Sequence, residues 1–470
     1  MIHNLKPYPA YKDSGVQWLG EIPNTWRVLR GKNVFRVIDV KSETGDEELL
    51  TVSSKDGVLP RSQKTVTMFK AESYVGHKLC WPGDLVINSL WAWMQGLGFT
   101  KYHGLISSAY SVYRPLQESS SYANYFNYAL QSAAYKWELQ TRSKGVWLSR
   151  LQLSDLAFLD MPIIIPPPAE QSAIVCYLDH IDRQIRRYIR LKQKLIKLLE
   201  EQKQAIIHQA VTRGLDPNIR LKPSGVEWLG EIPEHWEVRR VKQISQILRG
   251  KFTHRPRNDP AFYDGLYPFI QTGEVARAVK VITSFKQTLN DRGLAISKMF
   301  PRGTLVMTIA ANIGDVAVLD FEACFPDSVV GFVPHNFVER DFLYYVFCAM
   351  KSELLCEAPV NTQGNLNVDR IGSREIGLPS FTEQREIVRF VEESTADLEQ
   401  IMTVARSEIS LLREYRTRLI ADVVIGKLDV RKAAANLPEE IDEMEVLDNE
   451  LVEDEETTEE DHEGEPEEET

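Results

Sequence analysis

Short runs of arginine, lysine, asparagine, glutamine and tryptophan occur in both halves of the chain, beside glycine and serine. Arginine and lysine neutralise phosphates and bridge guanine, whereas asparagine and glutamine pair with adenine. Glycine and serine let the backbone approach a ligand closely. We therefore hypothesise contact with DNA for runs such as NSLWAWMQG (88–96), TRSKGVWLSR (141–150) and LRGKFTHRPRN (248–258).

The candidate DNA contacts form two sets, one in each half of the chain. The first set is Ser53, Ser54, Lys55, Asn88, Ser89, Trp91, Gln95, Lys101, Tyr102, Tyr110, Arg142, Lys144 and Arg150. The second set is Arg249, Lys251, His254, Arg255, Arg257, Gln271, Thr272, Asn312, Thr362, Gln363 and Asn365. A bland interpretation stays open for each residue alone, because basic loops are often merely solvated and Trp91 and Trp93 also suit a core.

The sequence lacks the motifs of common enzyme classes. It contains no GxxxxGK[ST] phosphate loop, no HExxH pair and no GxGxxG after a strand. The nine histidines form no ligand pair at helical spacing, and the five cysteines form no CxxC pair. We therefore expect a binding protein with no catalytic residues, no metal and no cofactor of its own.

The formal net charge of −12 hides a basic body. Residues 438–470 contain 19 acidic residues and no lysine or arginine, so residues 1–437 keep 55 basic and 48 acidic residues, a net charge of +7. A basic body permits a polyanionic partner. The acidic segment has too little apolar content to fold, so we expect a disordered tail that either solubilises the protein or competes with nucleic acid.

Nothing in the sequence predicts export or a membrane partner. No stretch has the eighteen or more apolar residues of a membrane span, and the first fifteen residues lack the apolar core of a signal peptide. The scattered cysteines suit free thiols in a reducing compartment. We therefore expect a cytoplasmic protein.

An internal repeat predicts the elements that position the candidate contacts. SGVQWLGEIPNTW (14–26) recurs as SGVEWLGEIPEHW (224–236), with ten of thirteen residues identical. PPPAEQSAIVCYLD (166–179) recurs as PSFTEQREIVRFVE (379–392), and KQAIIHQAVTRGLD (203–216) as RTRLIADVVIGKLD (416–429), both at an offset of 213. A constant offset indicates one element of fixed length that occurs twice.

Each copy of this element has the apolar spacing of a long helix. Gly214 and Gly426 are placed to end the two helices, and Thr382 is placed to cap the second. Polar residues interrupt the two apolar seams at different positions, so we expect the helices to pair with each other as a coiled coil. The expected seam residues are Ile174, Leu178, Ile181, Ile185, Leu195, Leu199, Ile206, Ile387, Val391, Leu398, Ile401, Leu412 and Leu419.

The segments between the helices are rich in glycine, aromatic and β-branched residues, which predict strand-rich lobes. Strand-like runs are GDLVINSL (83–90), AYSVYRP (109–115), GTLVMTIA (303–310), GDVAVLDF (314–321) and SVVGFVP (328–334). The predicted class is α+β, with two mixed α/β globular lobes separated by two long helices. The expected boundaries are 1–165 for the N-terminal segment and first lobe, 166–215 for the first helix, 216–378 for the repeated segment and second lobe, 379–430 for the second helix, and 431–470 for the tail.

Together these segments resemble the specificity subunit of type I restriction–modification systems. The resemblance rests on YKDSGVQWLGEIPNTW (11–26) and its copy at 224–236, on IPPPAEQ (165–171) and LPSFTEQ (378–384), and on PGDLV (82–86). It covers residues 10–430 and leaves out the acidic tail. The second copy departs from the pattern, because Pro379-Ser380-Phe381 replaces Pro-Pro-Pro.

The resemblance implies two target recognition domains, each binding one half of a split double-stranded DNA sequence. It implies antiparallel helices that set the spacer, with pseudo-twofold symmetry. Two modification (methyltransferase) subunits would bind around the helices and lobes, supply S-adenosylmethionine and methylate adenine. Restriction subunits would join for translocation and cleavage that need ATP and Mg²⁺. The chain itself would be a non-catalytic DNA-recognition subunit.

The sequence leaves two main alternatives, besides an RNA-binding variant that would lack the usual motifs of a stacking platform. One is a nuclease or methyltransferase with undetected motifs, although the repeat already occupies the whole length. The other is a structural coiled-coil scaffold whose lobes bind protein partners rather than DNA. Isolated lobes that retain no DNA at low salt would favour this scaffold.

Overall fold

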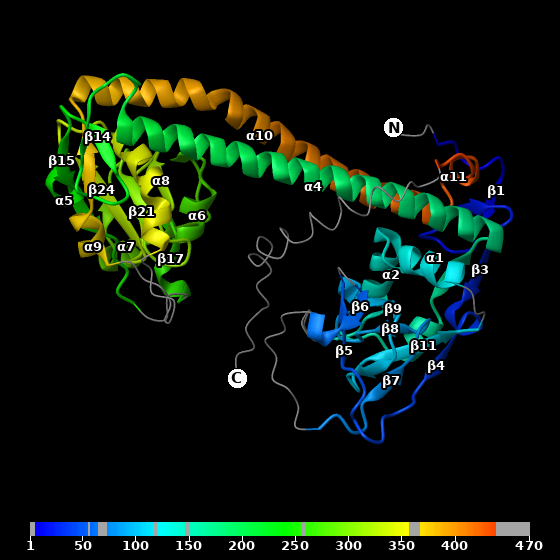
Figure 1. The fold of residues 1–470 in the computed structure, drawn as a ribbon. Coiled ribbons are helices and arrows are strands. Elements are labelled where there is room, and N and C mark those ends of the chain that lie inside the picture. The colour runs from blue at the N-terminus through cyan, green and yellow to red at the C-terminus, as the bar shows by residue number, and fades with distance from the viewer. Residues whose placement is uncertain are drawn as a thin grey trace. The chain divides into compact units, whose positions relative to one another are not determined.

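A computed structural model describes residues 5–54, 57–63, 73–116, 120–145, 151–254, 259–356 and 367–438. The chain forms two compact units. One consists of the residues up to Lys192 together with those from Ser407 onward, and the other of Gln193–Arg406. Each unit contains one strand-rich lobe and part of each of two long helices (Figure 1). The predicted α+β class with two lobes and two long helices is confirmed.

The long helices are α4 (Pro168–Arg213), with 46 residues, and α10 (Phe381–Val424), with 44 residues. They lie side by side and run in opposite directions (Figure 1). Ion pairs join them at positions that rise along one helix as they fall along the other: Asp182–Arg416, Lys192–Glu408 and Lys203–Glu399. Lys192 and Glu408 both interrupt the apolar seams in the sequence, and their side chains meet at 2.7 Å.

The apolar seam shifts by one residue near the middle of the helices. Leu195 is 36% exposed and Ile401 is 46% exposed, whereas Ile196 is partly buried and Met402 is 2% exposed. The other expected seam residues are buried (Ile174, Leu178, Ile181, Ile185, Ile387, Val391, Leu419) or partly buried (Leu199, Ile206, Leu398, Leu412). Leu195 and Ile401, which the sequence predicts in the seam, therefore lie outside it. Each has an apolar neighbour one position along, and the facing helix decides which of the two it covers.

The ends of the helices follow local backbone chemistry. Gly214 and Gly426 have φ angles of +72° and +81°, a conformation that glycine adopts without steric cost, and each lies just past the last helical turn. At the start of α10 the cap is Ser380 rather than Thr382, because the Ser380 Oγ accepts a hydrogen bond from the Glu383 N–H at 3.3 Å. The helix therefore begins at Phe381, two residues earlier than a Thr382 cap predicts.

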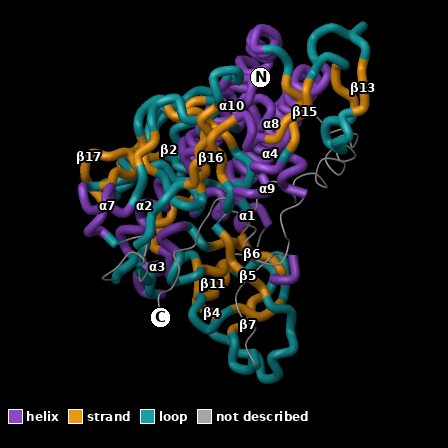
Figure 2. The backbone as a smooth tube through the Cα atoms, turned by 90° about the vertical axis from the view of Figure 1, so that its left-hand side faces the viewer, coloured by secondary structure: helices purple, strands orange, loops and turns teal. Residues whose placement is uncertain are grey.

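The described residues of lobe 1 (31–161) form one four-stranded sheet, two strand pairs and short helices. Its main sheet has the order β4 (Phe35–Ile38), β11 (Ser111–Pro115), β8 (Leu85–Ile87), β9 (Leu97–Phe99), with all neighbours antiparallel. The strand pairs are β5 (Leu50–Ser53) with β6 (Gly57–Pro60) and β7 (Lys78–Cys80) with β10 (Gly104–Ile106). Figure 2 shows β4, β5, β6, β7 and β11 gathered in one region. The helices are α1 (Ser120–Leu130), α2 (Ala133–Arg142) and α3 (Asp155–Leu159), with 3₁₀ turns at Gly31–Asn33, Arg61–Gln63 and Ala92–Met94.

Lobe 2, residues 241–374, contains two larger sheets. The first has the order β16 (Ser245–Arg249), β24 (Val329–Pro334), β21 (Leu305–Thr308), β22 (Val316–Leu319), β18 (Val281–Ile282). The second has the order β19 (Gln287–Leu289), β17 (Tyr263–Phe269), β23 (Ala323–Cys324), β20 (Met299–Phe300). The helices are α5 (Val241–Ile244), α6 (Thr272–Arg277), α7 (Asp291–Ile296), α8 (Arg340–Cys356) and α9 (Val368–Ser373), with a 3₁₀ turn at Pro260–Phe262.

The two lobes share one sheet core although their sequences barely align. The order β4-β11-β8-β9 in lobe 1 corresponds to β16-β24-β21-β22 in lobe 2, with antiparallel pairing throughout both sets. Each of the five strand-like runs expected from the sequence contains one strand of these sheets. The loop between β8 and β9 therefore corresponds to the loop between β21 and β22.

The repeated WLGEIP segments join each lobe to the helices in the same way. Each forms a short hairpin, β1 (Tyr11–Asp13) with β2 (Glu21–Pro23), and β13 (Leu221–Pro223) with β14 (Glu231–Pro233). A following strand then pairs with the strand before the helix, β3 (Arg27–Arg30) with β12 (Pro162–Ile165), and β15 (Glu237–Arg240) with β25 (Glu375–Leu378). The repeat is thus a scaffold that receives the chain as it enters and leaves each lobe.

At each junction between a lobe and the helices, a buried tryptophan is hydrogen-bonded to the first turn of a long helix. The Nε1 of Trp26 donates to Glu170 at 2.8 Å, and the Nε1 of Trp236 donates to Glu383 at 3.0 Å. Both indoles are fully buried, and both carboxylates lie in the first turn of a long helix, where a negative charge is favourable. The ring of Trp26 also packs against Gly426, where an added Cβ would lie 3.0 Å from Cζ3. The last turn of α10 therefore packs on this junction as well.

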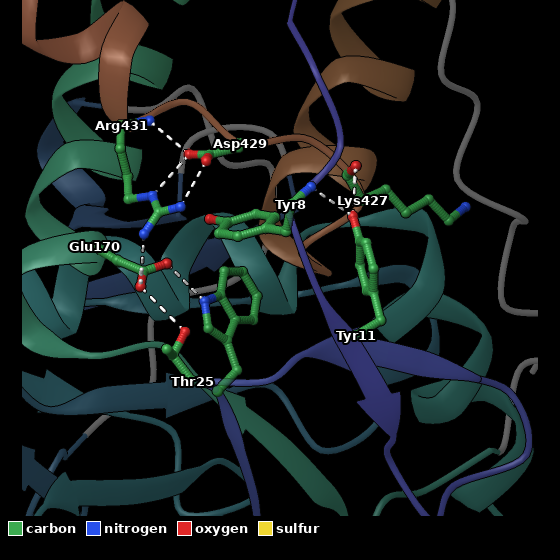
Figure 3. A network of polar contacts seen from close by, with 8 residues as sticks. Tyr8, Tyr11, Thr25, Glu170, Lys427, Asp429 and Arg431 are labelled. Atoms are coloured by element: carbon green, nitrogen blue, oxygen red, sulfur yellow. Dashed lines mark hydrogen bonds and ion pairs between the residues drawn. The ribbon is translucent and has the colours of Figure 1, made fainter.

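The region after α10 corrects one expected boundary. Residues 431–435 form helix α11 (Arg431–Ala435), although the sequence assigns them to the disordered tail. Arg431 binds Asp429 at 2.7 Å, approaches Glu170 at 3.7 Å and lies over the Tyr8 ring (Figure 3). The hydrogen bonds that the Arg431 side chain and backbone N–H donate to Asp429 lower the pKa of this carboxyl group. Tyr11 donates to the Lys427 carbonyl in the same network (Figure 3), and the acidic residues from 439 onward lie outside the described residues.

The cysteines differ in their expected reactivity. Burial raises the pKa of Cys80 to about 12 and the pKa of Cys348 to about 11, whereas Cys176 is exposed on α4. Because the thiolate is the reactive form, iodoacetamide at pH 8 should alkylate Cys176 at least about 10-fold faster than Cys80 or Cys348. Peptide mass spectrometry over a time course measures this order. In a denatured control the three rates should converge, and equal rates in the native protein would contradict the described burial.

Candidate nucleic-acid interface

The loop between β8 and β9 holds four candidate contacts of lobe 1. Asn88 donates from Nδ2 to the Tyr110 hydroxyl at 3.2 Å, so these two candidates are brought together. Ser89 is buried, with its Oγ at 3.1 Å from the Ser111 Oγ. Trp91 is 45% exposed at the tip, and the Nε2 of Gln95 donates to the carbonyls of α1 and the following turn. The loop thus offers Asn88 and Trp91 to a ligand and uses Ser89 and Gln95 to hold its shape.

A network of largely buried hydroxyl groups connects this loop to β11 and α3. Ser111 and Tyr113 on β11 both donate to Asp155 Oδ1 at 2.7 Å, and Ser111 reaches Ser89. Burial and the bond to Asp155 raise the pKa of Tyr113, and burial raises the pKa of Tyr110. The O–H of Tyr113 is committed to Asp155, whereas the Tyr110 hydroxyl accepts from Asn88 and can still donate its own proton.

The other described candidates of lobe 1 are more scattered. Ser54, Lys101 and Lys144 are exposed, whereas Ser53 and Tyr102 are partly buried. Arg142 is bound to Glu138 on the same helix and lies 3.8 Å from Asp160. Its charge is therefore already paired within the lobe.

In lobe 2 the described candidates occupy strand ends and loops. Lys251 is exposed, and Arg249 donates from Nε to the Asp327 carbonyl at 3.1 Å. His254 packs on the Phe262 ring at 4.3 Å and lies 3.1 Å from Asp259. Gln271 precedes α6 and bonds to Gln287, while Thr272 begins α6. Asn312 is exposed in the β21–β22 loop.

Seven candidate contacts lie outside the described residues, and the structure says nothing of them. They are Lys55, Arg150, Arg255, Arg257, Thr362, Gln363 and Asn365.

The structure adds residues that the sequence did not single out. Trp137 on α2 is 52% exposed, and Asp155 anchors the hydroxyl network. The sequence did offer a signal for Trp137. The helical run YKWELQTR is mostly polar, so not all of its side chains can be buried, and a tryptophan there is a candidate for exposure. Asp155 gave no signal, because its role depends on β11 lying beside α3.

A row of exposed apolar side chains follows each long helix. On α4 the row is Tyr188, Leu191, Leu195 and Leu198, spaced by three and four residues. On α10 it is Ile401, Val404 and Leu411. Exposed apolar rows of this kind are typical of surfaces that contact another protein.

Neither a metal-binding cluster nor a membrane-spanning helix occurs in the part of the chain that the structure describes. In that part of the chain, no group of three His, Cys, Asp or Glu side chains is arranged to hold a metal ion. Among the helices described, none is both long and apolar enough to cross a bilayer.

The second lobe and much of α10 are similar to a known family of protein domains. Residues 233–408 match the model of the type I restriction modification DNA specificity domain. In Methanocaldococcus jannaschii, the type I restriction enzyme MjaIX specificity subunit is 24% identical over 167 residues, 34% of this chain and 38% of its own length. The MjaVIII specificity subunit of the same organism is 25% identical over 245 residues, 49% of this chain and 52% of its own. The chain thus spans about two fifths to one half of these curated relatives.

A solved structure supports the same fold. A chain in the work described as "Structural basis underlying complex assembly and conformational transition of the type I R-M system" has a TM-score of 0.62 and 17% identity, over 87% of this chain and 99% of that one. At this identity the likeness concerns the fold alone. The chain is therefore similar to type I restriction enzyme specificity subunits, and its residues 233–408 match the model of the type I restriction modification DNA specificity domain.

Proposed function

We propose that this chain is the DNA-recognition subunit of a type I restriction–modification complex, in which each lobe binds one half of a split DNA target. The observation that supports this most is the reuse of one scaffold for two different lobes. The lobes share the four-strand order and the Trp–Glu junction, yet their loops differ in length and residue type. A common scaffold with divergent loops suits two unrelated half-sites.

In this proposal the paired helices set the distance between half-sites. α4 has 46 residues, and a helix rises about 1.5 Å per residue, so its length is a fixed quantity. Phosphate contacts would supply affinity that falls with salt, and the divergent loops would supply sequence selectivity.

We further propose that two modification subunits dock on the exposed apolar rows of α4 and α10. Those subunits would supply S-adenosylmethionine and methylate adenine, and restriction subunits would supply the chemistry that needs ATP and Mg²⁺. The chain itself would bind DNA without catalysis or a cofactor. The sequence repeat would present the same kind of surface twice, which suits two copies of one partner.

The test is adenine-methylation mapping, by single-molecule sequencing, in cells that make this chain with its methyltransferase partner. We expect one methylated split motif, formed by two short half-sites around a fixed gap. The motif should vanish without this chain, and exchanging residues 31–161 for another lobe should change one half only. An active partner that methylates no split motif would disprove the proposal and favour lobes that bind proteins.

A further inference from the structure

The β8–β9 loop presents a flat apolar tip to solvent. Leu90 and Trp91 are both exposed, and the Trp91 ring stacks on Trp93 with centroids 6.2 Å apart and planes at 22°. The Nε1 of Trp93 donates to the Leu90 carbonyl at 3.1 Å, so Trp93 supports the tip from within the loop. Trp91 is therefore an exposed indole beside a second, partly buried indole.

The loop holds this tip in a defined conformation. Gln95 has a φ of +61°, a left-handed conformation that costs energy for a residue with a side chain. Its Nε2 donates to the Leu130 and Ser132 carbonyls at 3.0 and 3.1 Å, which keeps the strained residue in place. A Cβ added at Gly96 would lie 3.1 Å from the Trp91 Cβ, so the small residue makes room for Trp91.

The corresponding loop of lobe 2 has the same strain without the aromatic rings. Ala311, between β21 and β22, has a φ of +59°, and its neighbours are Ala310 and Asn312. Two lobes of divergent sequence thus strain the same hairpin. Strained non-glycine residues concentrate at functional sites. The difference between the loops is chemical, with indoles in lobe 1 and a small apolar and amide surface in lobe 2.

We propose that Trp91, supported by Trp93, stacks on a base of the half-site bound by lobe 1 and wedges open one base step. Apolar side chains that enter a duplex unstack neighbouring base pairs, and a rigid ring does so at low entropic cost. DNA is the favoured occupant because residues 1–437 carry a net charge of +7 and Asn88, a possible base contact, lies on the same loop. The inference rests on the proposed function and assigns the wedge to one half-site only.

The test uses the complex of this chain with its methyltransferase subunit and duplexes that contain the mapped target. 2-Aminopurine replaces single bases in turn through both half-sites, except at the methylated adenines, because a methyltransferase extrudes its own target base. We expect a fluorescence increase at one step of the lobe 1 half-site. Trp91→Ala should abolish it and weaken duplex binding about 10- to 100-fold.

Three further variants separate stacking from folding. Trp91→Phe keeps a ring and should retain part of the affinity and signal. Gln95→Gly tolerates the left-handed backbone but loses both hydrogen bonds, so it should also give a reduced signal. Leu156→Ala removes another exposed apolar side chain of lobe 1, on α3, and should change neither readout. Equal melting temperatures for these variants confirm that the lobe is intact.

Several outcomes would overturn the inference. The wedge is excluded if the Trp91→Ala complex binds the duplex within twofold of the unaltered complex and still gives the 2-aminopurine fluorescence increase. A variant that loses the methyltransferase subunit instead of DNA makes Trp91 a protein contact. An unaltered complex that binds no duplex selectively overturns the proposed function and this inference together, whereas selective binding that ignores Trp91 overturns this inference alone.

Discussion

Replacing Trp236 by alanine is expected to lower the free energy of unfolding of the unit formed by Gln193–Arg406 by about 3–5 kcal/mol. The indole is fully buried in a core that also contains Ile207 of α4 and Ile387 of α10. Truncation leaves a cavity at this junction, and Glu383 loses the Nε1 donor that it accepts from at 3.0 Å. Lobe, junction and both helices of the unit should lose stability together.

Hydrogen–deuterium exchange with mass spectrometry locates this effect. In Trp236→Ala, exchange should rise in β14, β25 and the start of α10, while β2 and β12 keep their protection. Trp26→Ala is the matched variant, and it should reverse the pattern, because Trp26 occupies the same place in the other unit. Trp137→Ala should leave both patterns unchanged. Uniform loss of protection in both units would show that the two junctions do not act separately.

Placing a charge on the exposed row of α4 is expected to abolish capture of the methyltransferase subunit. Leu191 and Leu198 are 46% and 53% exposed, so Leu191→Glu and Leu198→Glu cost the isolated chain little. In a complex each leucine would contribute about 1.5–3 kcal/mol if fully buried, and a carboxylate there would lack a partner. We therefore expect the double variant to bind the subunit at least about 100-fold more weakly.

Surface plasmon resonance with immobilised methyltransferase subunit measures this loss. Gln193→Glu is the matched control, because Gln193 is exposed on the same helix and points away from the row. Gln193→Glu should bind within about twofold of the unaltered chain. Undiminished binding by the double variant, or an equal loss in the control, would place the docking surface elsewhere on the chain.

The lobes show how far local sequence can predict structure. The run GDLVINSL predicts a strand because it is apolar and β-branched, and β8 (Leu85–Ile87) lies within it. The sequence does not reveal that β8 lies between β11 and β9, because that order depends on pairings between residues far apart in the chain. The sequences around β8 and β21 align only faintly, whereas the two strands occupy the same position in the strand order of their sheets.

The candidate interface depended more on tertiary contacts. Asn88 and Ser89 are neighbouring polar residues of similar promise, yet Ser89 is buried against Ser111 whereas Asn88 is partly exposed. Arg142 is as basic as Lys144, but Glu138 already pairs with it. In each case a contact with another side chain, Ser111 or Glu138, decides how available the candidate is to a ligand.

The sequence by itself determined the repeat, the two long helices, the glycines that end them and the absence of common catalytic motifs. These properties follow from local patterns, since helical spacing and left-handed turns depend on neighbouring residues. Only the tertiary structure decided which apolar residues form the seam. At 195–196 and 401–402 both neighbours are apolar, and the partner helix covers Ile196 and Met402 more than Leu195 and Ile401. Which side chain is buried depends on how the two helices pack together, and this packing leaves Leu195 and Ile401 exposed.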